Sequence, residues 1–167
     1  MADEYIADVN AGHNIVASVY VETLAFARTD GPEWLCPLGE VEFANGVAAM
    51  TAGGLYDRTE ICAGIVGFAD LRLGREVGPL LDRCLEAAPE RFRGIQQLIL
   101  EMVDDRPFPT VIGIAPPTGI MEHEGFRIGL AEVQKRGLTF DAGVFHHHLP
   151  KLGERTSIKW TKRKFNV

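Results

Sequence analysis

Residues 125–150 read GFRIGLAEVQKRGLTFDAGVFHHHLP and carry the clearest structural signal in the chain. Phe126, Leu130 and Val133 repeat at helical spacing, which predicts a helix over about residues 122–136. Gly137 is a typical residue for ending such a helix. A β-rich apolar run over residues 138–145 comes next, and three histidines follow it directly. A helix that leads into a buried strand is half of a βαβ unit, so the stretch predicts an α/β protein with a parallel sheet.

Three earlier β-rich runs extend this pattern towards the N-terminus. They span residues 15–21, 61–68 and 92–95. Helical patterns lie before and between them, over residues 4–11, 33–52 and 76–88. Strands that alternate with helices at this spacing predict four parallel β/α units joined by right-handed crossovers.

Composition indicates one main domain. A chain of 167 residues with 46% hydrophobic residues can bury one substantial core, which we assign to residues 1–154. No run of 18 apolar residues occurs, and the chain opens Met-Ala-Asp-Glu, so we expect no membrane span, no signal peptide and a cytoplasmic location. The three cysteines are widely spaced among apolar neighbours, which favours buried, reduced thiols.

Charge separates the last residues from the rest. Residues 155–167 hold five basic residues and no acid, although the whole chain has a net charge of −6. We expect this tail to be a solvated extension unrelated to the domain, and a basic arm for nucleic acid or anionic lipid is the alternative. Because the rest of the chain is strongly acidic, nucleic acid is not expected as the main ligand.

The residues that follow the β-runs are the candidate site residues. Parallel sheets place ligand chemistry at the carboxyl ends of their strands. The residues at those positions are Glu22, Asp70, Gln96 with Gln97, and His146. Carboxylates and a neutral imidazole suit zinc or manganese, whose bound water is a strong nucleophile near neutral pH. We therefore predict His146, Asp70 and Glu22 as catalytic residues, His146 as a metal ligand, and the two glutamines as substrate-binding residues.

Each candidate also has a structural interpretation. Glu22 could pair with Arg28, Asp70 could cap the helix after it, and the glutamines could be ordinary loop residues. Strand alternation would put His146 and His148 on one face and His147 on the other. His146 is nearest the strand, so we expect it to face the pocket, with His147 and His148 nearer the surface.

Several separate phrases of the chain resemble the amidohydrolase-related proteins. The resemblance covers residues 5 to about 153 in order, and its phrases are YIAD (5–8), AGHNIVASVYVE (11–22), GEVEFANGVAAM (39–50), AGIVGFAD (63–70), RFRGI (91–95), GLTFD (137–141), His146 and Leu149-Pro150. These proteins are metal-dependent or metal-free hydrolases, among them lactonases and decarboxylases, built on a distorted (β/α)8 barrel. The resemblance implies that our four strands are the second to fifth of such a barrel, so that this chain forms a partial barrel that does not close.

The resemblance also implies a function, and it identifies family site residues that have no counterpart in this chain. The expected activity is hydrolysis of a C–N or lactone C–O bond in a small carboxylated molecule, with His146 as the one metal or substrate histidine that carries over. The family's His-X-His pair on the first barrel strand has no counterpart here, and Gln96-Gln97 replaces the Arg-His that often follows Arg-Gly-Ile. We therefore expect the chain to be truncated and catalytically incomplete by itself, or else to be a non-catalytic α/β fragment with a binding or assembly role.

An unclosed barrel predicts self-association. Four strands leave two unpaired edges and one apolar sheet face without a partner layer. The inner face would expose Val19, Ile65, Ile95 and Val144, which is enough apolar surface to make the chain a dimer or an aggregate.

Overall fold

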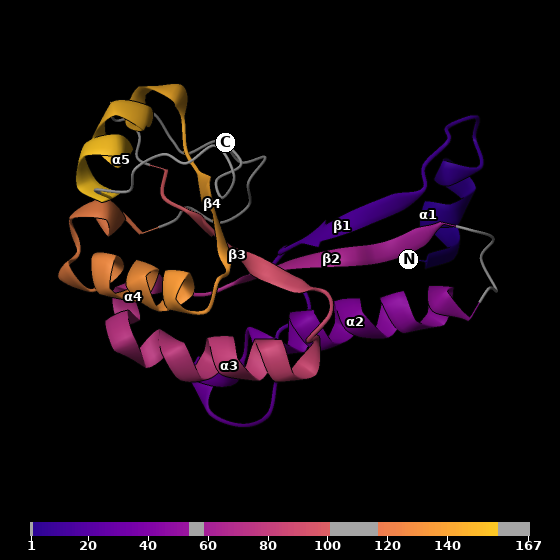
Figure 1. Ribbon diagram of the computed structural model, residues 1–167, viewed down its shortest axis with the longest axis horizontal. Helices are drawn as coiled ribbons and strands as arrows, with labels where there is room; N and C mark the ends of the chain where they lie inside the picture. Colours follow the sequence, from indigo (N-terminus) through magenta and orange to yellow (C-terminus); the bar gives the residue numbers. More distant parts are fainter. Residues whose placement is uncertain (1, 54–58, 101–116, 157–167) are drawn as a thin grey trace. The chain divides into compact units, whose positions relative to one another are not determined.

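The computed structural model describes residues 2–53, 59–100 and 117–156. Four strands alternate with helices along the chain, as Figure 1 shows. The strands are β1 (Ala17–Val21), β2 (Glu60–Phe68), β3 (Phe92–Leu98) and β4 (Thr139–Gly143). The α-helices are α1 (Ala2–Val9), α2 (Leu38–Ala52), α3 (Val77–Ala87), α4 (Glu124–Lys135) and α5 (Leu149–Thr156). Short 3-10 helices cover η1 (Glu33–Leu35), η2 (Leu71–Glu76), η4 (Ile120–Glu122) and η5 (His146–His148).

The strands form one open parallel sheet in the order β1-β2-β3-β4. This confirms the predicted α/β class with four parallel strands and no closed barrel. The carboxyl ends of two strands differ from the prediction. β3 continues to Leu98, so Gln96 and Gln97 lie inside the strand, whereas β4 already ends at Gly143. The polar glutamines had suggested an earlier end for β3, but the strand continues because the backbone ladder and buried neighbours outweigh side-chain polarity.

The chain divides into two compact units. The first, called the N-terminal unit here, comprises residues 1–68 and 79–94. The second, the C-terminal unit, comprises residues 69–78 and 95–167. The predicted basic tail from residue 157 onwards lies outside the described residues.

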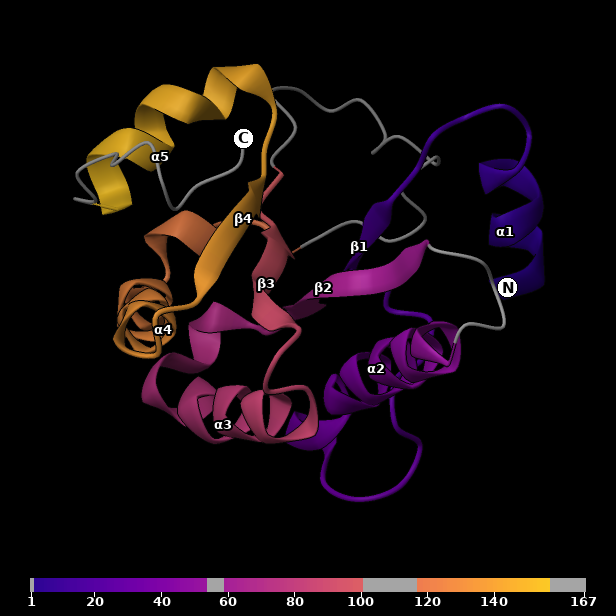
Figure 2. The same cartoon turned by 45° about the vertical axis from the view of Figure 1, so that its right-hand side comes forward.

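Packing of α2 against β2 forms the core of the N-terminal unit (Figure 2). Val41, Ala44 and Ala48 recur at helical spacing on α2 and are almost fully buried. The two elements approach closely, because a Cβ on Gly67 of β2 would lie 3.1 Å from the Val41 side chain. Burial of this face stabilises the unit, since each fully buried aliphatic side chain contributes about 1.5–3 kcal/mol.

In the C-terminal unit, α4 packs against η2 and β4. The helix begins at His123, whose Nδ1 accepts a hydrogen bond from the Gly125 amide, and it ends before Gly137, which has a φ of 68°. Phe126 contacts Phe140 of β4 edge to face, with ring centroids 6.0 Å apart. A Cβ on Gly125 would clash with the Arg72 carbonyl oxygen, so glycine at this position lets α4 approach the backbone of η2. The predicted helix and its glycine end are confirmed.

The expectation of four exposed inner-face residues is wrong in part. Val19 is exposed, but Ile65 and Ile95 are almost fully buried and Val144 is half-buried. The error arose because apolar strand residues were assigned to one face from their type alone. No described helix is long and apolar enough to cross a membrane. Cys62 and Cys84 are buried free thiols as predicted, and Cys36 is half-buried and free.

Candidate functional site

Glu22 directly follows β1 at its carboxyl end. Its amide extends the sheet by donating to the Val66 carbonyl of β2, with N and O 2.9 Å apart. The residue is half-buried. The alternative that Glu22 pairs with Arg28 is wrong, because Arg28 pairs with Glu42 of α2 instead. Glu22 therefore has no salt bridge among the described residues, which leaves its carboxyl group available for chemistry.

Glu40 in the first turn of α2 fixes the loop after β1. Its carboxylate accepts hydrogen bonds from the Tyr20 hydroxyl at 2.7 Å, and from the Thr23 amide and hydroxyl at 2.8 and 2.6 Å. The Leu24 amide donates to its second oxygen at 3.3 Å. Only 3% of the Glu40 surface is exposed, so these donors replace the water that an ionised carboxylate requires.

The environments of the two glutamates separate their pKa values. Burial, and secondarily the charge of Glu40, raise the pKa of Glu22 from 4.5 to about 7. Burial also acts against ionisation of Glu40, but hydrogen bonds from Thr23 and Tyr20 outweigh it and hold the Glu40 pKa below its usual range. A pair of carboxyl groups separated in this way contains one group that exchanges protons near neutral pH and one that stays charged.

Asp70 follows β2 and makes a contrasting cluster in the C-terminal unit. Its carboxylate accepts a bidentate pair of bonds from the Arg72 guanidinium, the closer of which is 2.6 Å. It also accepts from the Arg72 amide at 3.0 Å, which confirms the alternative that Asp70 caps the following helix. The hydrogen bonds and charge of Arg72 outweigh burial and lower the Asp70 pKa. Asp70 therefore remains ionised and positions η2.

One of the two predicted glutamines joins this cluster. The Gln97 amide group donates to Asp70 at 3.2 Å, and its carbonyl oxygen accepts from the Leu71 amide at 3.1 Å. Gln97 is 3% exposed, so its polar atoms serve the η2 backbone. Gln96 is half-buried. The structure therefore brings together Asp70 and Gln97, whereas Glu22 belongs to the other unit.

The three histidines form η5 and do not continue β4. Strand alternation therefore does not apply to them. His146 and His147 are exposed, whereas His148 is buried and its Nδ1 accepts from the Phe145 amide at 3.1 Å. The expectation of a surface His148 is wrong, because in a 3-10 turn every third side chain returns to the same side and His148 closes the turn onto Phe145.

The described residues do not fit the expected zinc or manganese site. No group of three or more histidine, cysteine, aspartate or glutamate side chains gathers in the part of the chain that the structure describes. A zinc enzyme normally supplies three protein ligands. His146 as a metal ligand stays a prediction, and no chemical step is derived through a cation.

Sequence reasoning missed two carboxyl groups. Glu40 shares the spacing of Ala44, Val47 and Thr51 on the buried stripe of α2, and a charged residue on an apolar stripe is the signal that would have found it. Asp141 lies within β4, and among the described residues its buried Oδ1 has no hydrogen-bond partner. Burial raises the pKa of Asp141.

Comparisons of the chain with protein-family models, with curated proteins and with solved structures found no match. The resemblance to amidohydrolase-related proteins therefore stays a prediction, and the functional argument depends on the geometry described above.

Proposed function

We propose that this chain is part of a hydrolase of the amidohydrolase-related type and that Glu22 is its general acid–base. The observation that carries the proposal is the carboxyl pair after β1, in which Glu22 has a pKa of about 7 and Glu40 stays ionised. The expected substrate is a small carboxylated molecule with a lactone or amide bond.

The chemistry needs one group that accepts and returns a proton. Glu22 as carboxylate takes a proton from water while the water oxygen attacks the carbonyl carbon. The protonated Glu22 then gives that proton to the departing oxygen or nitrogen as its bond to carbon breaks. A group with a pKa near 7 serves both steps at neutral pH, and such catalysis contributes about 100- to 10,000-fold in rate.

The loop after Glu22 offers apolar surface to a substrate. Leu24 and Phe26 are exposed within four residues of Glu22, and the Phe26 ring stacks on Phe43 of α2 at 3.8 Å between centroids. Glu40 fixes this loop through Thr23 and Leu24. An apolar ring could rest on Phe26 while its carbonyl group approaches Glu22.

Hydrolysis of a panel of γ- and δ-lactones and carboxylated anilides tests the proposal. We expect Glu22→Gln to lower kcat/KM by about 100-fold or more, because the amide cannot exchange the proton. The wild-type kcat/KM should rise with pH through a single ionisation near pH 7.

Glu42→Gln is the matched control, because Glu42 lies on the same helix as Glu40 but is exposed and paired with Arg28. Its kcat/KM should equal that of the wild type. Hydrolysis that Glu22→Gln leaves unchanged, or no hydrolysis across the panel, contradicts the catalytic proposal.

A divalent cation at His146 is a separate proposal. Its remaining ligands would have to come from outside the described residues. Purified protein that holds one zinc or manganese per chain, and loses it in His146→Ala but not in His147→Ala, would support it. Equal, substoichiometric metal in all three proteins would contradict it.

A non-catalytic assembly role is the second candidate, and the exposed edge strand favours it. Among the described strands β1 is an edge of the sheet, and Val16, Val19 and Val21 in and beside it are 69%, 61% and 39% exposed. Exposed apolar residues on an unpaired strand favour pairing with a second copy. Size-exclusion chromatography should show a dimer that Val19→Lys converts to monomer and that Met50→Lys, on an exposed site of α2, leaves intact.

A further inference from the structure

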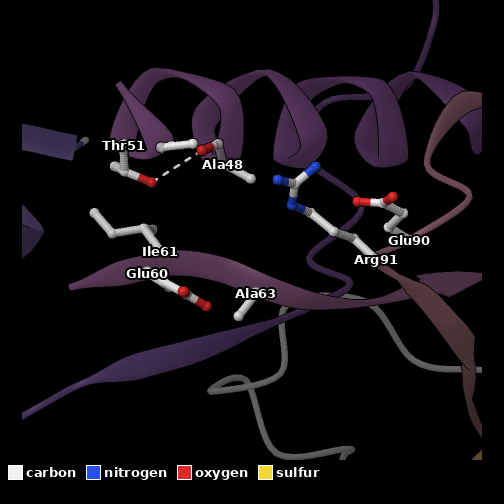
Figure 3. Close-up of a pocket in the computed structure, with 8 residues that line it drawn as sticks. Ala48, Thr51, Glu60, Ile61, Ala63, Glu90 and Arg91 are labelled. Atoms are coloured by element: carbon white, nitrogen blue, oxygen red, sulfur yellow. Dashed lines mark hydrogen bonds between the residues drawn. The ribbon is translucent and has the colours of Figure 1, made fainter. Parts of the chain in front are cut away.

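A pocket lies at the amino ends of β2 and β3, away from the carboxyl end of β1. It has a volume of about 360 Å³ and belongs entirely to the N-terminal unit (Figure 3). Cavities of roughly 300–1,000 Å³ are the usual size for small-molecule sites. α2 forms one wall, and the first residues of β2 and the residues just before β3 form the rest.

Arg91 is the cation of the pocket and is held in place. Its Nη1 donates to the Asn45 side-chain oxygen at 3.0 Å, and Asn45 is itself fixed by donating to the Ala87 carbonyl at 2.9 Å. Figure 3 shows the guanidinium reaching from the start of β3 towards α2. Its remaining donors have no partner among the described residues, and a guanidinium fork with free donors suits a carboxylate.

Glu90 places an anion beside this cation. The two side chains lie at the same end of the pocket in Figure 3, and no ion pair joins them in the described structure. Glu90 is exposed, so its carboxylate remains hydrated and can receive an ammonium group. Adjacent positive and negative groups match the carboxylate and ammonium of an α-amino acid, which are carried by the same carbon atom.

Thr51 of α2 and Glu60 of β2 are further polar residues of the pocket wall, and the remaining lining residues are apolar. Ala48 and Ala52 line it from α2, and Ile61 and Ala63 line it from β2. β2 is irregular there, because Ala17 of β1 pairs with Glu60 and Val19 pairs with Gly64, so β2 advances four residues while β1 advances two. Between them Cys62 adopts a φ of 54°. Bulges of this kind are enriched next to binding sites, where they redirect side chains.

We infer that this pocket binds an apolar α-amino acid, with its carboxylate on Arg91, its ammonium group on Glu90 and its side chain against the alanines and Ile61. The site lies at the opposite end of the strands from Glu22. The inference is therefore independent of the proposed hydrolase activity and would stand if that activity were absent.

Titration calorimetry with three matched probes tests the inference. The probes are L-leucine, 4-methylpentanoate, which lacks the amino group, and 3-methylbutylamine, which lacks the carboxylate. We expect saturable binding of L-leucine at least about tenfold tighter than of either analogue, because each analogue loses one charge-assisted interaction. No binding of L-leucine, or equal binding of all three, overturns the inference.

Two variants locate the binding. Arg91→Gln and Glu90→Gln should each weaken the binding of L-leucine by about tenfold. Arg83→Gln is the control, because it removes the same charge from an exposed position of α3 that does not line this pocket. If Arg91→Gln does not fold, Glu90→Gln still decides, since Glu90 is exposed and its substitution leaves the core untouched. Equal affinity of Glu90→Gln and wild type overturns the inference.

Discussion

Glu22 and Asp70 occupy equivalent sequence positions and have opposite electrostatic environments. Each acid comes directly after, or within two residues of, a β-strand. Burial, and secondarily the nearby Glu40 carboxylate, raise the pKa of Glu22 in the N-terminal unit to about 7. Asp70 in the C-terminal unit pairs with Arg72, and its pKa falls. Burial and neighbouring groups, which the fold supplies, decide whether such a residue exchanges protons or stabilises structure.

Gly125→Ala should have the largest effect, because it breaks the packing that holds the Asp70 cluster. The new Cβ would clash with the Arg72 carbonyl oxygen and push α4 away from η2. We expect a loss of about 3 kcal/mol or more in the free energy of unfolding, measured by urea denaturation. Gly46→Ala is the control, because a Cβ there meets nothing within 4 Å and should stabilise α2 by about 0.5–1 kcal/mol. Equal stability of the two variants would contradict the close packing of α4.

Glu40→Gln should reduce the difference between the Glu22 and Asp70 environments, because it removes the charge beside Glu22. The amide keeps the shape of Glu40 but replaces one accepting oxygen by an NH2 group, which would face hydrogen-bond donors. This mismatch should lower the free energy of unfolding by about 1–3 kcal/mol. Removal of the neighbouring charge should also lower the pKa of Glu22, although not to 4.5, because burial is the larger cause. Carboxyl ¹³C chemical shifts followed against pH measure this change. A Glu22 pKa that does not move would show that Glu40 has no electrostatic influence on it.

Glu22→Gln should remove a pH dependence of stability that is opposite in sign to that of an ordinary paired acid. The folded-state pKa of Glu22 is above its unfolded value of 4.5, so the contribution of this group to stability is most favourable below about pH 4.5 and is lost as pH rises through about 7. After allowance for solvent screening of a half-exposed group, Glu22→Gln should be more stable than wild type by on the order of 1 kcal/mol at pH 8. Urea denaturation at pH 5 and pH 8 measures the difference in free energy of unfolding between variant and wild type. This difference should be smaller at pH 5. A gain that grows at the lower pH would refute the raised pKa.

Arg72→Gln should have the smallest effect. It removes the guanidinium that lowers the Asp70 pKa, so that pKa should return towards its usual range. Because about a third of the Arg72 side chain is exposed, the loss of stability should not exceed about 1 kcal/mol. The stability contributed by the depressed Asp70 pKa is present above its ordinary value of 3.8 and disappears as pH falls through the folded value. The difference between variant and wild type should therefore shrink in acid, and an unchanged Asp70 shift in the variant would contradict the pairing.

Hydrophobic spacing was sufficient for most of the fold and for part of the site. Residues such as Phe126, Leu130 and Val133 mark one helical face wherever they occur, because periodicity is a local property. The sequence also predicted the capping role of Asp70 as an alternative, since the capped amide lies only two residues away. The end of β3 was not predicted, because it depends on neighbours distant in sequence. The turn of the histidines is closed by a local contact between Phe145 and His148, and it was missed because the predicted strand was extended beyond Gly143.

The sequence by itself determined that strands and helices alternate, where acids follow strands, and that the sheet is parallel. These features follow from side-chain period and connection length, which act over a few residues. Only the tertiary structure decided that Glu40 reaches Tyr20 and Thr23, that Arg72 holds Asp70 together with Gln97, and that Asn45 aims Arg91 into a pocket. Coulomb and desolvation energies depend on distances in space, and the linear order of residues does not contain those distances.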